Sequence, residues 1–433
     1  MRLDKNICLG GRYNGKMIRR IKYNGYVIYP NTYSEYNIYE VEILRNNTTI
    51  YLDAINRTNL PQVPFYDFGD GVVNPTVGST TILGEVYVTY TYEKAGLYQV
   101  RTSDFLHLDN PNSYLVKSII ALTSDLKDAS HLCGGFTGLT SFENAQIDSL
   151  DRITTMEHMF SNCENLETVI FTESEFPNLN TMELMFSSCN RLETVDFSYC
   201  DLSGVSDMGG MFQSCDRLKT VNFSHCNLSN ITDLSETFFA SFKCSAENID
   251  FSHCDLSGLT TLENAFYLSP TDTIDLSNAN LSNVTSLRYA FQESYIKNLN
   301  LSGVILGNIT DMSYMFSGCS TLKEIDLSML DTSNVSTMLG LFSQCPLLES
   351  VDIRNFDLLR VGTLNEQQMF ADCPKLHTIY MNNCNYNTIR RIINSYGFPT
   401  GEHPEGVTRK IYCKQTDAAG LTEPDGWDFI YVN

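Results

Sequence analysis

The sequence predicts a β-rich α/β solenoid of about ten rungs, preceded by an all-β sandwich and a short β-hairpin segment. Three observations predict this fold. A phenylalanine-anchored motif returns about every 26 residues through the later part of the 433-residue chain, strand-like runs precede the repeats, and two Asn-Gly dipeptides lie near the start. Repeats with a period of about 20 to 50 residues are typical of solenoids and related arrays. We therefore divide the chain into residues 1–33, 34–112, 113–383 and 384–433.

The composition argues against several classes of function. The chain has 51 Asp and Glu against 29 Lys and Arg, which gives a formal net charge of −22. Phosphate contacts need clustered basic residues, so we expect no nucleic acid partner. An anionic membrane surface would repel such a chain, and no apolar run reaches the ~18 residues of a membrane helix. The basic start lacks the apolar core of a signal peptide, so we expect a protein made in a reducing cytoplasm; a mature ectodomain without its export signal is the alternative.

Residues 1–33 predict two successive tight hairpins. Asn14-Gly15 and Asn24-Gly25 each follow a tyrosine, and Asn-Gly suits the type I′ turn of a two-residue hairpin loop. Seven basic residues against Asp4 give this segment a formal charge of +6 and leave −28 for the rest of the chain. A solvated β meander and a docking segment for another protein both fit this pattern. The candidate docking residues are Arg12, Tyr13, Lys16, Arg19, Arg20, Lys22 and Tyr23.

Residues 34–112 predict an all-β sandwich. Strand-like runs separated by turn clusters lie at 36–44, 49–52, 85–92 and 98–102. The motifs YDFGDG at 66–71 and YTYEKAGLYQVR at 90–101 resemble the polycystic-kidney-disease-type (PKD) immunoglobulin-like domain, with Tyr66 in place of the usual tryptophan. This resemblance implies a spacer or a weak binding module and no chemistry.

Each repeat of residues 113–383 predicts a short helix followed by a strand. The anchor phenylalanines lie at 136, 160, 186, 212, 239, 266, 291, 316, 342 and 370. In the copy at 308–328, Met312, Met315 and Phe316 have the spacing of one helix face, whereas Ile325 and Leu327 have the alternation of a strand. One such unit cannot bury its apolar face alone, but stacked units bury it against their neighbours.

This pattern resembles the leucine-rich repeat, and most closely the bacterial-surface-protein type of BspA-like adhesins and mycoplasma lipoproteins. The copy NITDMSYMFSGCSTLKEIDLS at 308–328 is similar to the signature of that type, and the similarity weakens around Phe239, Phe266 and Phe291. The resemblance implies one parallel strand per rung. It also implies that residues 384–433 close the array, with a helix ending at Gly397 and Trp427 packed in the cap. We expect residues 114–126 to form the opening strand and cap at the other end.

Ten of the 14 cysteines fall in two positions of the repeat. One position lies three residues after the anchor phenylalanine, and the other three residues after the last apolar residue of the strand. A small apolar thiol suits a buried row, so we expect reduced core cysteines rather than disulfides. Zinc at His225-Cys226 and His253-Cys254 is disfavoured because adjacent side chains point apart. The recurring Asn-x-Ser/Thr sequences, like that at Asn308, suit turn and capping chemistry better than glycosylation.

The outward strand positions form the candidate ligand face. Its residues are Asp196, Asn222, Asp250, Asp275, Asn300, Asp326 and Asp352. Strands stack about 4.8 Å apart, so these side chains should form one polar row. This polar row is compatible with three interpretations: a solvated face with local Asp–Ser hydrogen bonds, a surface for a polar or basic partner, or a calcium site between carboxylates. The face has almost no aromatic residue before Tyr380, which disfavours a glycan.

The sequence contains no nucleotide-binding loop, Gly-x-Ser-x-Gly motif or His-Glu-x-x-His motif, so we expect a non-enzymatic protein without a cofactor. The start of the chain is similar to N-terminal segments of virion proteins from phages of gut bacteria. We therefore predict a bacteriophage virion protein on the particle surface, as a capsid decoration, head fibre or tail fibre. Residues 1–33 would dock on other virion proteins, the solenoid would bind a host surface protein or glycan, and a homo-oligomer is compatible. A bacterial cell-surface adhesin is the alternative.

Overall fold

The structure is a computed structural model of the whole chain. It describes residues 129–130, 132–143, 150, 152–234, 237–238, 247–362, 368–401 and 406–432, and nine strands before residue 129. No helix of these described residues is long and apolar enough to cross a membrane.

The first hairpin forms as the Asn14-Gly15 dipeptide predicts. Strand β1 (Gly11–Tyr13) pairs antiparallel with β2 (Lys16–Ile18), and Tyr13 lies opposite Lys16 across a two-residue connection. The second predicted hairpin, around Asn24-Gly25, lies outside the described residues.

Seven strands form two antiparallel sheets in the region predicted to be a sandwich. One sheet has the order β5-β8-β3-β9 and the other β4-β7-β6. Their bounds are β3 Asn37–Ile43, β4 Thr48–Asp53, β5 Tyr66–Asp67, β6 Gly78–Ile82, β7 Glu85–Tyr92, β8 Gly96–Thr102 and β9 Val116–Ala121. The four predicted strands are therefore found within two residues at each end. The assignment to the PKD type stays a prediction, because most of the YDFGDG motif lies outside the described residues.

Strand β9 corrects one expectation. Residues 114–126 were expected to open the solenoid, but β9 pairs antiparallel with β3. The β-branched residues of VKSIIA favour a strand in either sheet, so the sequence does not reveal which sheet the segment extends.

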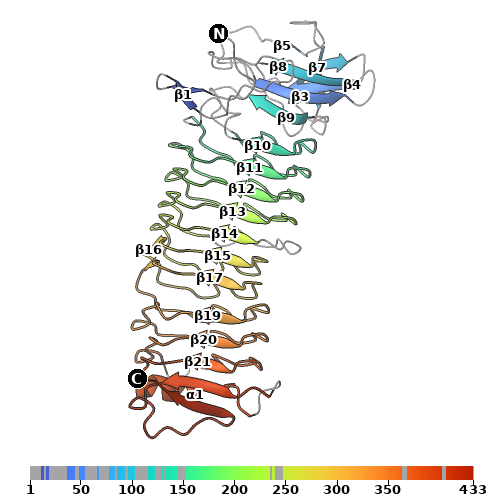
Figure 1. Cartoon of the computed structure of the whole chain (residues 1–433). Helices are drawn as coiled ribbons and strands as arrows, with labels where there is room; N and C mark the ends of the chain where they lie inside the picture. Colours follow the sequence, from blue (N-terminus) through green and yellow to red (C-terminus); the bar gives the residue numbers. More distant parts are fainter. Residues whose placement is uncertain are drawn as a thin grey trace.

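The remaining chain is a β-solenoid with about 26 residues per rung and very little helix. It makes about eight turns, close to the ten rungs predicted from the phenylalanine anchors. One parallel sheet contains β10 Ser141–Glu143, β11 Thr168–Ile170, β12 Thr194–Asp196, β13 Thr220–Asn222, β14 Asn248–Asp250, β15 Thr273–Asp275 and β17 Asn298–Asn300. A second contains β19 Glu324–Asp326, β20 Ser350–Asp352, β21 Thr378–Tyr380, β22 Arg409–Cys413 and β23 Trp427–Tyr431. Figure 1 shows these strands stacked along one side of the rod, and the short β16 (Asn280–Leu281) and β18 (Ile305–Leu306) on another side.

The predicted helix of each rung is wrong: in the described rungs that segment is a run of tight turns. The amide of Met315 donates to the carbonyl of Met312 within the rung, whereas the amide of Tyr314 donates to Leu339 of the next rung at 2.8 Å. Tyr314 has a positive φ of 56°. Successive turns also bring residues three and four apart to one side, which explains the helix-like spacing. A one- or two-turn helix is unstable alone, whereas this conformation adds hydrogen bonds between rungs.

Two phenylalanine rows fill the core. The first consists of Phe160, Phe186, Phe212, Phe238, Phe266, Phe291, Phe316, Phe342 and Phe370. Its ring centroids are 5.2 to 5.6 Å apart, and neighbouring rings lie within 20° of parallel. The second consists of Phe171, Phe197, Phe223 and Phe251. Each stacked pair contributes about 0.5 to 1.5 kcal/mol beyond its burial.

The anchor predicted at Phe239 is corrected to Phe238. Phe238 stacks on both Phe212 and Phe266, whereas Phe239 lies outside the described residues. Phe238 follows Phe212 by the usual 26 residues, so the additional length of this rung lies after the ring and before β14.

The predicted burial of the cysteines is confirmed for the 12 that the structure describes. The repeat also explains the choice of cysteine. The thiol of Cys189 donates to the carbonyl of Phe160 in the preceding rung at 2.9 Å, and Cys226 donates likewise to Phe197 at 2.9 Å. Burial raises the pKa of the Cys163 thiol to about 12, so these groups remain protonated donors near neutral pH.

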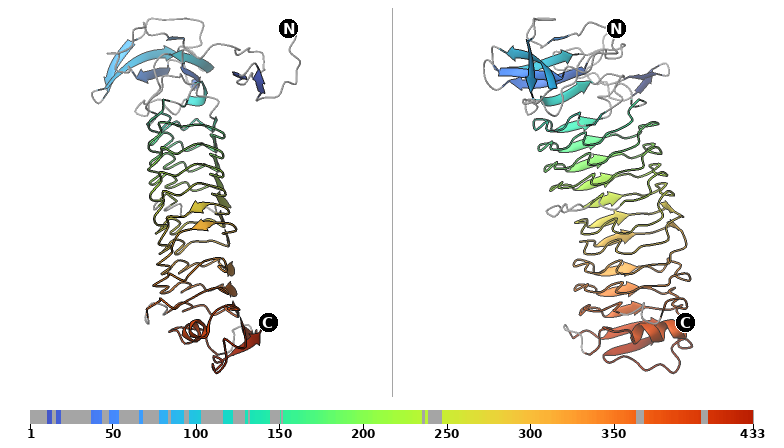
Figure 2. Two further views of the ribbon diagram at one scale, coloured as in Figure 1. Left: turned by 90° about the vertical axis from the view of Figure 1, so that its left-hand side faces the viewer. Right: turned by 180° about the vertical axis from the view of Figure 1, so that it is seen from behind.

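The C-terminal unit closes the solenoid, as predicted. Helix α1 (Tyr386–Ile393) begins after Asn385, whose side chain accepts a hydrogen bond from the amide of Thr388 at 2.9 Å. The helix ends at Ile393, with Asn394 as its C-cap, and not at Gly397 as predicted. Trp427 is 2% exposed and its indole donates to the carbonyl of Pro399. Phe398 lies between Trp427 and Phe370 and so ends the first phenylalanine row. Figure 2 shows α1, β22 and β23 lying across that end of the rod.

Candidate functional site

The strand face of the solenoid brings the seven predicted ligand residues into two groups. Asp196, Asn222, Asp250, Asp275 and Asn300 are register partners on successive strands of the first sheet. Asp326 and Asp352 are register partners in the second sheet. The predicted row is therefore formed, with a break where β17 and β19 belong to different sheets.

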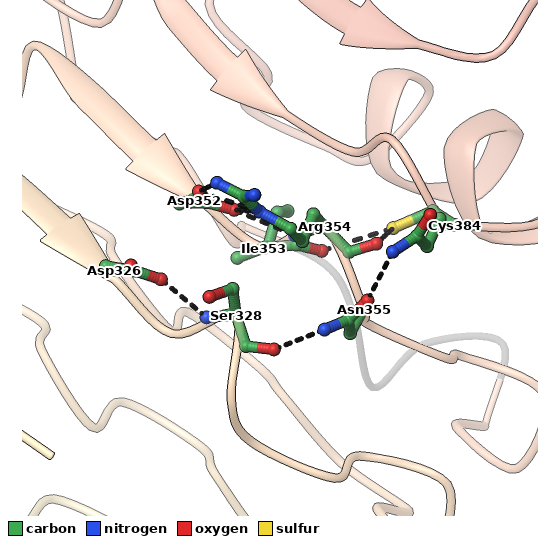
Figure 3. A network of polar contacts seen from close by, with 8 residues as sticks. Asp326, Ser328, Asp352, Ile353, Arg354, Asn355 and Cys384 are labelled. Carbon is green, nitrogen blue, oxygen red and sulfur yellow. Dashed lines mark hydrogen bonds and ion pairs between the residues drawn. The ribbon is translucent and has the colours of Figure 1, made fainter. Parts of the chain in front are cut away.

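Each residue of this row is partly engaged by its own backbone. One side-chain oxygen of Asp196 accepts the amide of Ser198 at 2.8 Å, and the same bond joins Asp326 to Ser328 at 2.8 Å (Figure 3). The equivalent bonds are 2.8 to 3.1 Å for Asn222, Asp250, Asp275 and Asn300. These Asx turns fix the corner that follows each strand. The local hydrogen bonds considered from the sequence are thus present, and one carboxylate oxygen per aspartate is committed to structure.

Asp352 is the most enclosed member of the row. It is 9% exposed, and its carboxylate accepts the Nε of Arg354 at 2.9 Å and also bonds the terminal guanidinium nitrogen (Figure 3). This hydrogen bond raises the pKa of Arg354. A carboxylate that is already paired in this way is a poor first choice for an incoming cation.

The residues just before each strand form a second row, which contains both acidic and basic side chains. Lys219 bonds Glu193 of the preceding rung at 2.6 Å, and Lys297 bonds Asp272 at 2.7 Å. Lys323 follows Lys297 in this row, so it meets a like charge on that side. In the described part of the chain neither Lys323 nor Glu349 forms an ion pair within 4.0 Å.

An exposed aromatic stack lies beside the face and was missed by the sequence reasoning. Tyr199, His225 and His253 follow their strands at the same position, with ring centroids 4.4 and 4.5 Å apart and nearly parallel planes. Tyr199 is 58% exposed, whereas Cys226 points into the core. The histidines and cysteines thus diverge, as expected. Among the described residues no group of three or more His, Cys, Asp or Glu is arranged to hold a metal ion.

A shallow hollow of about 440 Å³ lies on the strand face of β19, β20 and β21. Its lining residues are Lys323, Glu324, Glu349, Ser350, His377, Thr378 and Tyr380. Tyr380 stacks on Tyr412 of β22, with centroids 4.8 Å apart and planes at 23°. His377 and Thr378 are joined by a side-chain hydrogen bond of 2.8 Å. The sequence signal for this hollow was the appearance of Tyr380 in a row that holds Asp or Asn from Asp196 to Asp352.

The docking residues can be placed only in part. Arg12 and Tyr13 lie in β1 and Lys16 in β2, and their side chains are not described. Arg19, Arg20, Lys22 and Tyr23 lie outside the described residues, so the docking role stays a prediction.

Comparison with known proteins gives a family match. No curated protein matches the chain significantly. A family model described as a Mycoplasma protein of unknown function, DUF285, matches residues 130–251, 236–324 and 296–395. These overlapping matches follow the solenoid and together span more than half of the chain. The chain is a repeat protein that belongs to the DUF285 family.

Proposed function

We propose that this chain is a non-enzymatic structural and adhesion protein of a bacteriophage virion. It would dock on other virion proteins through residues 1–33 and present the strand face of its solenoid to a host surface protein or a glycan. The observation that carries the proposal is the rod itself: continuous core rows and a polar face that repeats in register over successive rungs. Such a rod suits display of a binding face at a distance from its anchor.

The charge distribution supports attachment through the N-terminal segment, with the solenoid pointing outward. The first 33 residues carry a formal charge of +6, and the rest of the chain carries −28. Opposite charges on the two parts favour a defined orientation on an acidic assembly surface, because like charges repel the body of the protein. Several copies on one particle would strengthen weak individual contacts through avidity.

Incorporation into particles tests this proposal directly. The full chain and a variant lacking residues 1–33 would be expressed with the phage, and purified particles would be analysed by quantitative mass spectrometry. We expect the full chain in the particles and at least a tenfold loss for the truncated variant. A matched control changes Lys219 and Lys297 of the solenoid to Gln and should incorporate normally. Absence of the full chain from particles, or full incorporation of the truncated variant, would refute the proposal.

A bacterial cell-surface adhesin is the second candidate function. The family match favours it, because the description of that family names a Mycoplasma protein. In this case residues 1–33 would be dispensable, and the protein would be found on cells rather than on particles. Protease treatment of intact cells that carry the gene, followed by immunoblotting, separates the two candidates.

A further inference from the structure

We propose that the hollow between β19 and β21 binds a saccharide. This inference rests on the proposed function and deepens it, because it names the ligand class and moves the binding site from the aspartate row to the C-terminal end of the strand face. The carrying observation is that a half-buried tyrosine ring, a hollow and two charged side chains without an ion pair among the described residues occur within three adjacent rungs.

Tyr380 supplies a surface for a sugar ring. Tyr412 of β22 stacks on one face of Tyr380, and Tyr380 lines the hollow together with residues of β19 and β20. Asp352, the register partner of Tyr380 on β20, is held by Arg354. A pyranose ring has C–H groups on one face that pack on an aromatic ring. The stacked partner also restrains Tyr380, so less side-chain freedom is lost on binding.

The polar lining suits hydroxyl groups. Glu324 and Glu349 offer carboxylate acceptors, Lys323 offers an ammonium donor, and Ser350 can donate and accept. Elsewhere in the same row lysine is neutralised by the preceding rung, as for Lys219 and Glu193. Because neither Lys323 nor Glu349 forms an ion pair with another described residue, both side chains can form hydrogen bonds to a ligand.

The mixture of charges selects against other ligand classes. A basic peptide would meet Lys323, and an acidic one would meet Glu324 and Glu349. A neutral molecule rich in hydroxyl groups uses both donors and acceptors without a net charge requirement. The volume of about 440 Å³ suits a monosaccharide or disaccharide end group and lies within the range of small-ligand sites.

A glycan microarray carrying mucin-type O-glycans and bacterial surface polysaccharides tests the proposal with the full chain. Any glycan bound there would be titrated as the free oligosaccharide by calorimetry. We expect Tyr380→Ala to weaken binding at least tenfold and Glu349→Gln at least fivefold. Tyr380→Phe keeps the ring and should stay within twofold of the original protein. Tyr199→Ala removes an exposed tyrosine of another row and should also leave affinity unchanged.

Two results would overturn the proposal: binding to none of the glycans on the array, or an unchanged affinity of Tyr380→Ala for the glycan. Urea unfolding of each variant checks that a loss does not come from misfolding, and Glu349→Gln provides a second, nearly isosteric change at another residue that lines the hollow. Adhesion of whole particles or cells separates this proposal from the proposed function. If adhesion persists in Tyr380→Ala, the saccharide site is wrong and the adhesive function stands. If the Tyr380-dependent glycan binding is found but the protein is absent from particles and cell surfaces, the adhesive function is wrong and the site stands.

Discussion

Replacing Gly340 by Ala tests the tight stacking of the turn segments. Gly340 has a φ of +58°, and a Cβ atom there would lie 2.5 and 2.6 Å from two ring carbons of Tyr314 in the preceding rung. The left-handed conformation costs an alanine about 1 kcal/mol, and the overlap adds about 1 to 3 kcal/mol. We therefore expect Gly340→Ala to lower the free energy of unfolding by about 2 to 4 kcal/mol.

Gly420 provides the matched control. Its φ is +82°, but a Cβ atom there would meet no atom within 4 Å, so Gly420→Ala should show the conformational cost of about 1 kcal/mol alone. Urea unfolding followed by circular dichroism measures both variants, and a double-mutant cycle with Tyr314→Ala isolates the overlap. The Tyr314 variant also loses its stack on Tyr289 at 5.5 Å, which the cycle corrects for. Equal effects of Gly340→Ala and Gly420→Ala, or no coupling in the cycle, would refute this reasoning.

Two further predictions concern the corner turns and the buried thiols. Asp250→Asn should change the free energy of unfolding by less than about 0.5 kcal/mol, because asparagine forms the same turn at Asn222. Asp250→Ala removes this hydrogen bond and should lower the free energy of unfolding by about 1 kcal/mol. Equal urea midpoints for the two variants would contradict this prediction. Burial raises the pKa of Cys163 and Cys384 from 9.0 to about 12, so the folded state retains protons that the unfolded state loses above pH 9. The contribution of each thiol to the free energy of unfolding should therefore be constant below pH 9. It should fall by at most about 1.4 kcal/mol per pH unit as the pH rises toward 12. Equal urea midpoints at pH 8 and pH 10.5 would contradict this prediction.

The repeat period made the stacked parts of the fold predictable. Residues at one position of every rung must lie above one another, so the phenylalanine rows, the buried cysteines and the polar strand row follow from the spacing alone. The error at Phe239 has the same origin, because two adjacent phenylalanines compete for one position and only packing decides between them.

The conformation within a rung was not predictable from spacing. Met312, Met315 and Phe316 satisfy a helix and a series of turns equally well. The distinction lies in the amide partners, which belong to the next rung. The positive-φ positions could not be recognised from residue type either, because residues as different as Leu184, Tyr314 and Gln344 occupy them.

The candidate site was predicted in outline only. The sequence gives the row that contains Asp326 and Asp352, but the pairing of Asp352 with Arg354 depends on a neighbouring corner. The tyrosine pair beside the hollow includes Tyr412, which belongs to the closing unit and not to the repeat. A pattern derived from the repeat therefore could not place an aromatic pair at that end.

The in-register core has a consequence for how the gene can change. Each rung of the first phenylalanine row offers its neighbour the same ring and the same carbonyl groups, and most rungs also offer a thiol, as between Phe316 and Cys345. A duplication or deletion of one whole repeat would therefore preserve the phenylalanine stacking and the backbone register on both sides of the junction. Each such event would alter the length of the rod by about 4.8 Å. Recombination between repeats could thus adjust the reach of the protein in fixed steps while leaving its two ends and the groups near its C-terminal closure untouched.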